Sequence, residues 1–416
     1  MPVDIIALGP LTNLALLLEN PPALGELVVL CGASPWISEQ MARHPVLLDE
    51  LLDRASLYTA PDKARLHDEL RQQVARLAPD DLEAQMEALR YFKASHVLRV
   101  AASELVGRLP LMQVSDNLTW IAEVILEQVL AVAWADLSNK YGEPRRDSTG
   151  YGFAIFGYGK LGGIELGYGS DLDLVFLHDS AGSEQKTAGA KPVDNNVFLT
   201  RLGQRIIHML ETFTAAGVLY EVDMRLRPSG NSGLLVSSLD AFADYQRSEA
   251  WTWEHQALVR ARVVAGDADL AARFAKVREQ VLAAGREPVT VRDEVRAMRE
   301  RMRAELGSRG GGGFHLKQDP GGIVDIEFMV QYLVLRWCRE HPELLRWTDT
   351  IRLLETLAAS ALLEAADAEA LIEAYQQYRA VAHRLTLAEA SSVIGDDKLK
   401  PERRMVTALW KRVMQS

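Results

Sequence analysis

A short segment between residues 153 and 177 most constrains the fold of this chain. It opens with the apolar run Phe153–Phe156 and closes with a second apolar run, Leu172–Leu177. Six glycines lie between the two runs. Short apolar runs bounded by glycine are typical of buried strands. The segment therefore predicts two strands joined by a glycine-rich loop.

The loop has the composition of a phosphate-binding cradle. Glycines let backbone N–H groups approach an anion closely and form concave nests of donors. A lysine and a serine in the same loop add side-chain donors. We therefore predict that the loop binds a nucleotide through Gly157, Gly159, Lys160, Gly162, Gly163 and Ser170.

Two aspartates follow the loop at the start of the second strand. Residues two apart on a strand face the same side, so Asp171 and Asp173 leave the sheet together while Leu172 and Leu174 enter the core. Converging carboxylates are the ligands that Mg²⁺ needs. The D-x-D pattern alone is weak, and a solvated strand end is the alternative. Residues 267–269 show the same spacing without a glycine loop, and we expect them to start a helix.

A third acid comes from residues 220–227, which alternate strictly between apolar and charged side chains. This alternation predicts a strand with Glu221, Asp223, Arg225 and Arg227 on one face. Arginine can grip phosphate oxygens in a bidentate way, so we add Arg225 and Arg227 to the predicted nucleotide contacts. Asp223 is the predicted third catalytic and metal-binding acid. The alternative is a solvent-facing edge with cross-strand ion pairs.

Helical periodicity flanks this sheet on both sides, so the sequence predicts three regions. Residues 1–140 form an N-terminal helical region, residues 141–266 hold the sheet, and residues 267–416 form a C-terminal helical bundle. The first boundary falls at residues 140–150, which are polar and rich in turn formers. The predicted fold class is α+β, with a mixed sheet.

The strongest helical run of the first region is Trp120–Trp134, which Asp116 or Asn117 would cap. In the middle region we expect a helix over residues 196–214 and a fourth strand over Val259–Ala265. The helices expected in the third region span residues 270–284, 291–306, 323–339, 351–363 and 368–390.

Composition narrows the setting of the protein. The only two cysteines, Cys31 and Cys338, lie in no metal-binding pattern, so a disulfide framework is not expected and a reducing compartment is the default. The apolar stretch at residues 5–8 has no basic segment before it, which argues against a signal peptide. No uncharged run approaches the roughly 18 apolar residues of a membrane span. We expect a cytoplasmic protein with no membrane partner. The net charge of −11 argues against general nucleic-acid binding.

The order of strand, glycine-rich loop, D-x-D strand, helix and acid-bearing strand resembles the DNA polymerase beta-type nucleotidyltransferase superfamily. Its signature is a small-residue loop followed about ten residues later by D-x-D. Gly157 or Gly159 would be the signature glycine. The residue after it is Tyr158 or Lys160, where that superfamily usually has serine or glycine.

Longer motifs resemble the family of glutamine synthetase adenylyltransferase and adenylyl-removing enzymes. The resemblance runs from about residue 13 to the C-terminus. The matching stretches are GASPW at 32–36, HP at 44–45, GKLGG at 159–163, ELGY at 165–168, SDLDL at 170–174, VD at 222–223, RLRPSG at 225–230, WEHQAL at 253–258, Lys317, DPGG at 319–322 and DIEF at 325–328.

This resemblance implies an enzyme that moves AMP from ATP to a tyrosine of glutamine synthetase with release of pyrophosphate, regulating nitrogen assimilation. It implies two Mg²⁺ ions at Asp171, Asp173 and Asp223, and regulation by a PII-type signalling protein and glutamine. The family usually joins two catalytic halves, and this sequence has one D-x-D behind a glycine loop. Residues 165–173 look more like the transferring half. The chain is then either a fragment or a reduced form.

Three alternatives stay open. The same kind of site could remove AMP from modified glutamine synthetase by phosphorolysis. The chain could be a nucleic-acid nucleotidyltransferase of the same superfamily, which the acidic charge disfavours. It could also be a non-catalytic module that responds to a PII-type protein, which the intact acid triad disfavours.

Several other charged residues carry weaker expectations. We expect Glu254 to be an exposed acid on a structural helix. Arg260 and Arg262 would face either phosphate or solvent. Asp325 and Glu327 fall in the first turn of a helix, where the helix dipole favours acids, and we expect them to help dock the helical bundle.

Overall fold

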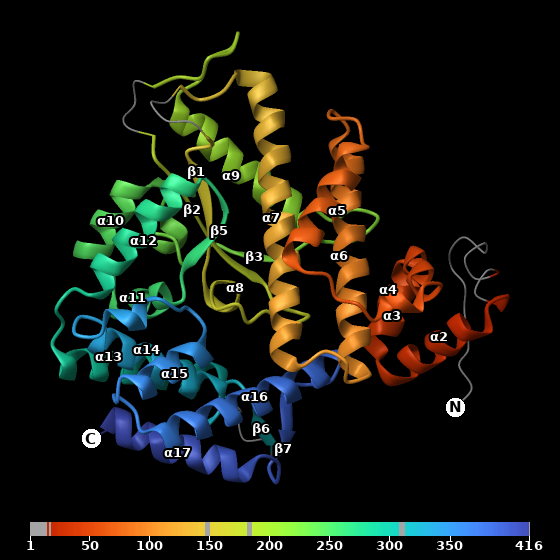
Figure 1. Cartoon of the computed structure of the whole chain (residues 1–416). Helices are drawn as coiled ribbons and strands as arrows, with labels where there is room; N and C mark the ends of the chain where they lie inside the picture. The colour runs from red at the N-terminus through yellow and green to blue at the C-terminus, as the bar shows by residue number, and fades with distance from the viewer. Residues whose placement is uncertain (1–14, 16–17, 146–149, 181–184, 308–312, 416) are drawn as a thin grey trace.

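The computed structural model describes residues 15, 18–145, 150–180, 185–307 and 313–415. The signal-peptide argument concerns residues 5–8, which lie outside the described residues. The structure is α+β with a mixed sheet, which confirms the predicted fold class. Figure 1 shows the sheet beside two long helices, with the C-terminal helices gathered below it.

The sheet has five strands: β1 (Phe153–Gly157), β2 (Leu172–His178), β3 (Val222–Asp223), β4 (Val236–Ser238) and β5 (Arg262–Gly266). Its order is β3-β2-β1-β5, and β4 also pairs with β2. β1 runs antiparallel to β2 and β5, whereas β3 and β4 run parallel to β2. The two predicted strands at 153–156 and 172–177 are confirmed, and β4 was not predicted.

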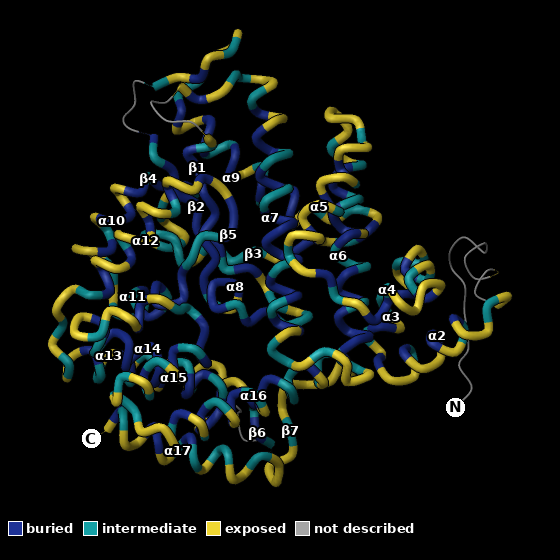
Figure 2. The backbone as a smooth tube through the Cα atoms, viewed as in Figure 1, coloured by how far each residue is buried: buried dark blue, intermediate teal, exposed yellow. Residues whose placement is uncertain are grey.

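Alternating side chains of β1 and β2 feed two different hydrophobic cores. Phe153 and Leu174 pack with α7 (Leu111–Tyr141) and α9 (Asn195–Glu211) on one face of the sheet. Phe156 packs on the other face, in a core shared with the helices that follow the sheet. Figure 2 shows both strands as buried tubes between these layers. Because Asp173 alternates with Leu172 and Leu174, it belongs to the face that the C-terminal helices cover.

The remaining helices after β3 surround that second face. Asp267 caps α12 through its side chain, as predicted for residues 267–269, by accepting hydrogen bonds from the backbone N–H groups of Asp269 and Leu270. The elements are α10 (Leu239–Ser248), α11 (Thr252–Val259), α12 (Ala268–Leu282), α13 (Pro288–Leu306), β6 (Gly313–His315), α14 (Ile323–Trp337), η3 (Pro342–Leu345), α15 (Thr350–Ala359), α16 (Ala365–Leu387), β7 (Val393–Gly395) and α17 (Lys400–Gln415). The predicted helices of this region are present, and α17 is an additional helix.

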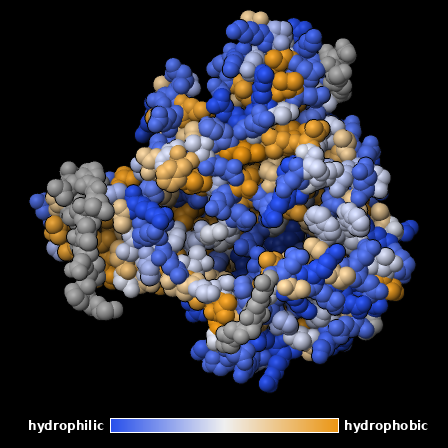
Figure 3. Space-filling view, turned by 180° about the vertical axis from the view of Figure 1, so that it is seen from behind, coloured by the Kyte–Doolittle hydropathy of each residue, from blue (hydrophilic) through white to orange (hydrophobic). Residues whose placement is uncertain are grey.

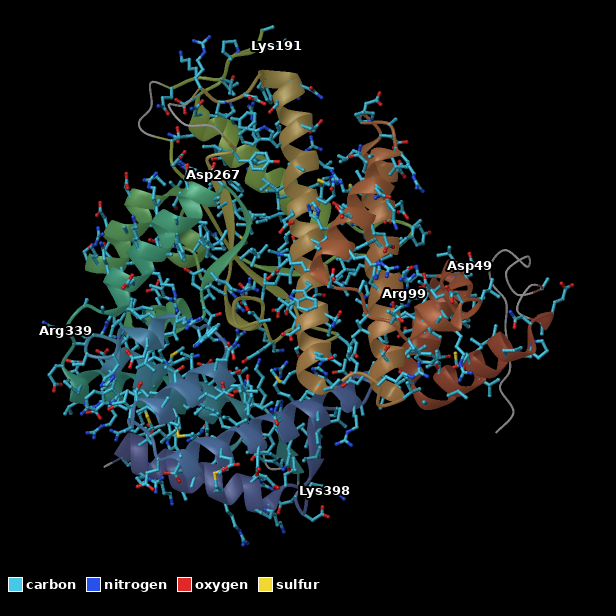
Figure 4. All side chains as sticks on the ribbon, in the orientation of Figure 1. Asp49, Arg99, Lys191, Asp267, Arg339 and Lys398 are labelled. Carbon is cyan, nitrogen blue, oxygen red and sulfur yellow. The ribbon has the colours of Figure 1, made fainter. Side chains whose placement is uncertain are left out.

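The described part of the N-terminal region is helical, as predicted. Its elements are α2 (Pro21–Ala33), α3 (Pro35–Arg43), η1 (Pro45–Leu51), α4 (Arg54–Leu57), α5 (Lys63–Ala75), α6 (Leu82–Leu105) and α7. Arg99 on α6 reaches η1, where its Nε lies 2.6 Å from Glu50, and Figure 4 shows it beside that segment. The helix predicted over Trp120–Trp134 is much longer, so Asp116 and Asn117 lie inside it and do not cap it.

Helix α7 is the one described helix that is long and apolar enough to cross a membrane. Two thirds of its apolar window, 67 %, is buried inside the fold. Its buried side chains pack against α5, α6, α9 and the sheet. A core helix of a folded protein can be as long and apolar as a membrane span. We interpret α7 as a core helix because most of its apolar window is buried inside the fold.

The three predicted regions share their cores. One hydrophobic cluster joins α5, α6 and α7 to the sheet, and another joins the sheet to the C-terminal helices. The division into residues 1–140, 141–266 and 267–416 therefore stays a prediction about chain segments, and packing links each segment to its neighbour.

Candidate active site

A cavity of about 590 Å³ lies between the start of β2 and the C-terminal helices. Residues 159–173 line one wall, and α11, α13, α14 and α16 line the others. Figure 3 shows a recess with hydrophilic residues between the upper and lower parts of the molecule. The predicted loop and acids thus meet the helical bundle at one place.

Gly159 brings the loop close to the second aspartate. Its φ is +51°, and a Cβ built on it would lie 2.0 Å from Oδ2 of Asp173. The backbone N–H of Tyr158 donates to the carbonyl oxygen of Asp173 at 2.9 Å. Only glycine fits both the backbone conformation and this close approach.

The other predicted glycines serve packing in the structure. A Cβ on Gly162 would lie 2.0 Å from the carbonyl oxygen of Arg260, and a Cβ on Gly163 would lie 2.1 Å from its guanidinium. A Cβ on Gly157 would lie 2.8 Å from the side chains of Leu161 and Val264. These three glycines are buried, and the glycines that line the cavity are Gly159, Gly167 and Gly169.

Lys160 and Ser170 are brought together at the cavity. The Lys160 ammonium lies 3.4 Å from the Ser170 hydroxyl, which accepts a hydrogen bond from the backbone N–H of Gly167 at 3.0 Å. Lys160 is accessible to water, yet protein surrounds its ammonium on most sides. Desolvation, together with the charge of Lys317, therefore lowers the pKa of Lys160.

Asp171, Asp173 and Asp223 line the same cavity, as the sequence predicts. Asp173 and Asp223 are register partners on the parallel strands β2 and β3. Burial and the neighbouring charges of Asp171 and Asp223 raise the pKa of Asp173 to about 6. Lys317 and Lys160 oppose this increase. Burial is the largest cause, and the two neighbouring carboxylates add electrostatic repulsion.

The third acid is not free to join the other two as the structure stands. Nε of Arg225 donates to both carboxylate oxygens of Asp223, at 3.0 and 2.8 Å. These hydrogen bonds hold the pKa of Asp223 below its usual range. Within the described residues, no three Asp, Glu, His or Cys side chains are grouped to hold a metal ion. The Arg225 side chain is 74 % exposed, so this ion pair is worth at most about 1 kcal/mol and exchanges readily.

The strand predicted over residues 220–227 is wrong except at residues 222–223. β3 comprises Val222–Asp223 alone, because Asp223 accepts a hydrogen bond from the backbone N–H of Arg225 at 2.8 Å and turns the chain. Arg227 consequently does not share a face with Arg225. Its guanidinium donates to the carbonyl oxygens of Met224 and Asn231, at 2.7 and 3.3 Å, and holds the turn.

A buried polar network that the sequence analysis does not predict joins the loop to the helical bundle. Arg260 forms ion pairs with Glu165 and with Glu327, the latter at 3.1 Å, and its Nε donates to the carbonyl oxygen of Gly159 at 3.0 Å. The Tyr375 hydroxyl donates to Glu165 at 2.6 Å and lies 3.1 Å from Glu327. Burial opposes ionisation of Glu165, but Arg260 and the hydrogen bonds hold its pKa below the usual range.

The network bears on the expectations for Arg260, Arg262 and Glu327. Arg260 lines the cavity but is buried and paired with Glu165 and Glu327. Arg262 is bound by Glu123 and the carbonyl oxygens of Leu161 and Gly162. Glu327 does dock the helical bundle, as expected, through its ion pair with Arg260.

Two further acids also have structural partners. Asp325 lies in the first turn of α14, where Arg299 and Arg303 bind it at 2.7 and 2.6 Å. Glu254 is buried, contrary to expectation. It accepts hydrogen bonds from the backbone N–H of Trp251 and the hydroxyl of Tyr245, both at 2.9 Å, and caps α11.

Comparison with known proteins places the chain in a family. Residues 24–277 match the family model of glutamate-ammonia ligase adenylyltransferase, which is more than half of the chain. The chain belongs to this family. Residues 291–393 also match the family model of GlnD PII-uridylyltransferase, so the second match covers most of the helical bundle.

Similar full-length proteins agree with this membership. A protein of Thioalkalivibrio sulfidiphilus is 56 % identical over 97 % of this chain, and one of Pseudomonas syringae pv. tomato is 57 % identical over 95 % of it. Both are named bifunctional glutamine synthetase adenylyltransferase/adenylyl-removing enzyme. In each case the aligned part covers 42 % of the relative, so this member of the family spans less than half the length of these proteins.

Proposed function

We propose that this chain transfers the AMP moiety of ATP to a tyrosine hydroxyl of glutamine synthetase and releases pyrophosphate. The observation that carries the proposal is the cavity where Asp171, Asp173 and Asp223 meet the glycine loop. The name of the relatives supports the choice of glutamine synthetase as acceptor. By this proposal the chain is a nucleotidyltransferase that acts in the cytoplasm on nitrogen assimilation, with a PII-type protein and glutamine as regulators.

The residues of the cavity have different roles in the transfer. Lys160, Ser170 and the backbone around Gly159 hold the triphosphate. Arg225 binds the triphosphate after the ion pair between Arg225 and Asp223 breaks. The acceptor oxygen attacks the α-phosphorus, the bond from that phosphorus to the bridging oxygen breaks, and pyrophosphate leaves. Positioning and charge neutralisation supply most of the rate enhancement of such reactions.

The acid cluster fits a divalent cation. Asp173 is buried and repelled by the carboxylates of Asp171 and Asp223, and a bound Mg²⁺ would compensate both effects. Asp171 and Asp173 would hold the ion, and Asp223 would join them after releasing Arg225. Two Mg²⁺ ions are the expected number. When bound, they would neutralise phosphate charge and lower the pKa of the acceptor hydroxyl.

We also propose an entrance for the acceptor. A second hollow of about 430 Å³ shares Asp171, Asp223 and Arg225 with the main cavity. Glu211 and Glu221 are among its other lining residues, and it is open to solvent. In-line displacement requires the acceptor to approach opposite the leaving group, which a second opening onto the same acids allows.

The decisive experiment incubates the chain with Mg²⁺, α-labelled ATP and unmodified glutamine synthetase. Label on the synthetase supports transfer. The alternative is removal of AMP by phosphorolysis, which the words adenylyl-removing in the relatives' name keep in view. Phosphate-dependent release of ADP from modified synthetase, without any transfer, would contradict the proposal and assign the chain to that reaction.

Changing Gly159 to alanine should reduce AMP transfer by at least about tenfold, because the added methyl group meets the Asp173 carboxylate. Steady-state transfer kinetics measure the effect. Gly107→Ala is the matched control, since Gly107 has φ +72° and open space around its Cβ. Both variants carry similar backbone strain, of about 1–2 kcal/mol. Equal losses of activity in the two variants would contradict a role for the close approach to Asp173.

Metal affinity should fall as the pH drops below about 6. A proton and a cation compete for Asp173, whose pKa is raised to about 6, so the metal-binding form is lost on acidification. Calorimetric titration with Mn²⁺ in buffers of different ionisation enthalpy measures both affinity and proton release. Release of up to about one proton per ion is expected near pH 5, and little near pH 8. An affinity that stays constant across this range would contradict the assignment.

A further inference from the structure

The cavity contains a lysine that comes from the helical part of the chain. Lys317 lies between β6 and α14 and lines the same cavity as Lys160, Asp171 and Asp173. It is about 145 residues along the chain from the acids, which is the difference between 317 and 171–173. The middle region therefore does not supply every cation that faces the predicted phosphate site.

The backbone that carries Lys317 is held in place on both sides. Nδ1 of His315 accepts hydrogen bonds from the backbone N–H groups of Lys317 and Gln318, at 3.2 and 3.3 Å. The carboxylate of Asp319 accepts from the backbone N–H of His315 at 2.8 Å. The carbonyl oxygen of Lys317 accepts from the N–H of Val324, at 3.3 Å, in the first turn of α14. A turn fixed by side chains presents the lysine to the cavity.

The three arginines of the cavity already have partners. Arg260 is bound by Glu165 and Glu327, and Arg225 by Asp223. Arg379 donates to the Ser115 hydroxyl and to the carbonyl oxygen of Glu165. Lys317 is exposed, and its ammonium forms no ion pair within 4.0 Å with any acid in the part of the chain that the structure describes.

The charge of Lys317 nevertheless acts across the cavity. It helps to lower the pKa of Lys160 and opposes the increase in the pKa of Asp173. Because Lys317, Lys160 and Asp173 also line one cavity, a polyanion bound there would meet both lysines. Three carboxylates alone would repel a triphosphate, and positive charge at this place reduces that repulsion.

We propose that Lys317 binds the β- and γ-phosphates of ATP together with Lys160, and stabilises the pyrophosphate that leaves. This inference rests on the proposed function and adds a residue to it. When the bond between the α-phosphorus and the bridging oxygen breaks, the electron pair stays on that oxygen. Lys317 donates a hydrogen bond to the phosphate oxygens and keeps its proton. The hydroxyl proton of the acceptor passes to Asp223 and then to solvent.

The proposal assigns a role to the helical bundle. Lys317 belongs to the helical bundle and Lys160 to the glycine loop. A bound triphosphate would therefore contact both parts of the chain. The buried network around Arg260 fixes the same two parts relative to each other. The complete phosphate site then exists only while the bundle is docked on the sheet.

The test compares the binding of pyrophosphate, ATP and AMP to the whole chain in the presence of Mg²⁺. Lys317→Ala should bind pyrophosphate and ATP about tenfold to a hundredfold more weakly, which is the usual effect of losing a charge-assisted hydrogen bond. Its affinity for AMP should change by less than about twofold, because AMP lacks the groups that Lys317 contacts. Lys317→Arg should recover most of the affinity, since it keeps the charge.

Lys398→Ala is the matched control. Lys398 is an exposed lysine on the turn after β7, at the outer edge of the bundle in Figure 4, and does not line the cavity. The inference is overturned if Lys317→Ala binds pyrophosphate as the unchanged chain does. It is equally overturned if all three ligands weaken together, which would indicate a structural role.

These outcomes separate this inference from the proposed function. Binding of pyrophosphate is measured without glutamine synthetase, so a selective loss in Lys317→Ala supports the phosphate site even if the chain performs removal and not transfer. Transfer by the unchanged chain, with undiminished pyrophosphate affinity in Lys317→Ala, would keep the function and reject the lysine. A chain that binds neither pyrophosphate nor ATP would overturn both.

Discussion

Replacing Asp173 with alanine should reduce AMP transfer to glutamine synthetase by about a thousandfold or more, because the loss of a metal-binding carboxylate removes several kcal/mol of transition-state stabilisation. The fold should survive. Burial and two like charges raise the pKa of Asp173 to about 6, so at neutral pH its ionisation lowers the stability of the folded state relative to the unfolded state. Removing it should leave the free energy of unfolding unchanged or slightly higher.

The measurement pairs transfer kinetics with urea unfolding monitored by circular dichroism. Asp244→Ala is the control, since the Asp244 side chain is 80 % exposed on α10 and lies outside the cavity. It should transfer AMP at the rate of the unchanged chain. Asp173→Ala with unchanged transfer would remove the acid cluster from the mechanism. A loss of transfer accompanied by an equal loss of stability would point to folding instead.

The sequence predicted the core of the site because its signals are local. Two apolar runs around a glycine-rich loop fix β1 and β2, and the two-residue period of a strand places Leu172 and Leu174 in the core. The same period puts Asp173 on the opposite face, at the cavity. Each of these inferences needs residues that are close in the sequence.

Alternation misled where a side chain competes with the sheet. Residues 220–227 alternate well enough for a long strand, but the Asp223 carboxylate accepts from the backbone N–H of Arg225 and ends the strand. The period of two then no longer applies, so Arg225 and Arg227 point to different partners. Aspartate favours turns for this reason, and that signal was present in the sequence.

The network around Arg260 could not be predicted from local pattern. Arg260, Glu165 and Tyr375 lie far apart in the sequence. Only the docking of the helical bundle on the glycine loop brings them together. The same docking explains the glycines at 162 and 163, because a Cβ at either position would meet Arg260.

Replacing Arg260 with leucine should lower the free energy of unfolding by about 3–5 kcal/mol, because it leaves buried acids without their partner. The Glu165 carboxylate is almost fully buried and Glu327 is 17 % exposed. The same change removes the donor to the carbonyl oxygen of Gly159, so transfer should also fall by at least about tenfold in the folded fraction. Urea unfolding and transfer kinetics measure the two effects separately.

Two further variants decide whether the buried charge is the cause. Arg43→Ala breaks an exposed ion pair whose side chains are 63 % and 41 % exposed, and should cost less than about 1 kcal/mol. Combining Arg260→Leu with Glu165→Leu should recover part of the lost stability, because an apolar pair avoids the unpaired acid. Transfer should stay low in that double variant, since Gly159 still lacks its donor. A double variant less stable than the sum of its parts would show that packing, and not charge, holds the bundle against the loop.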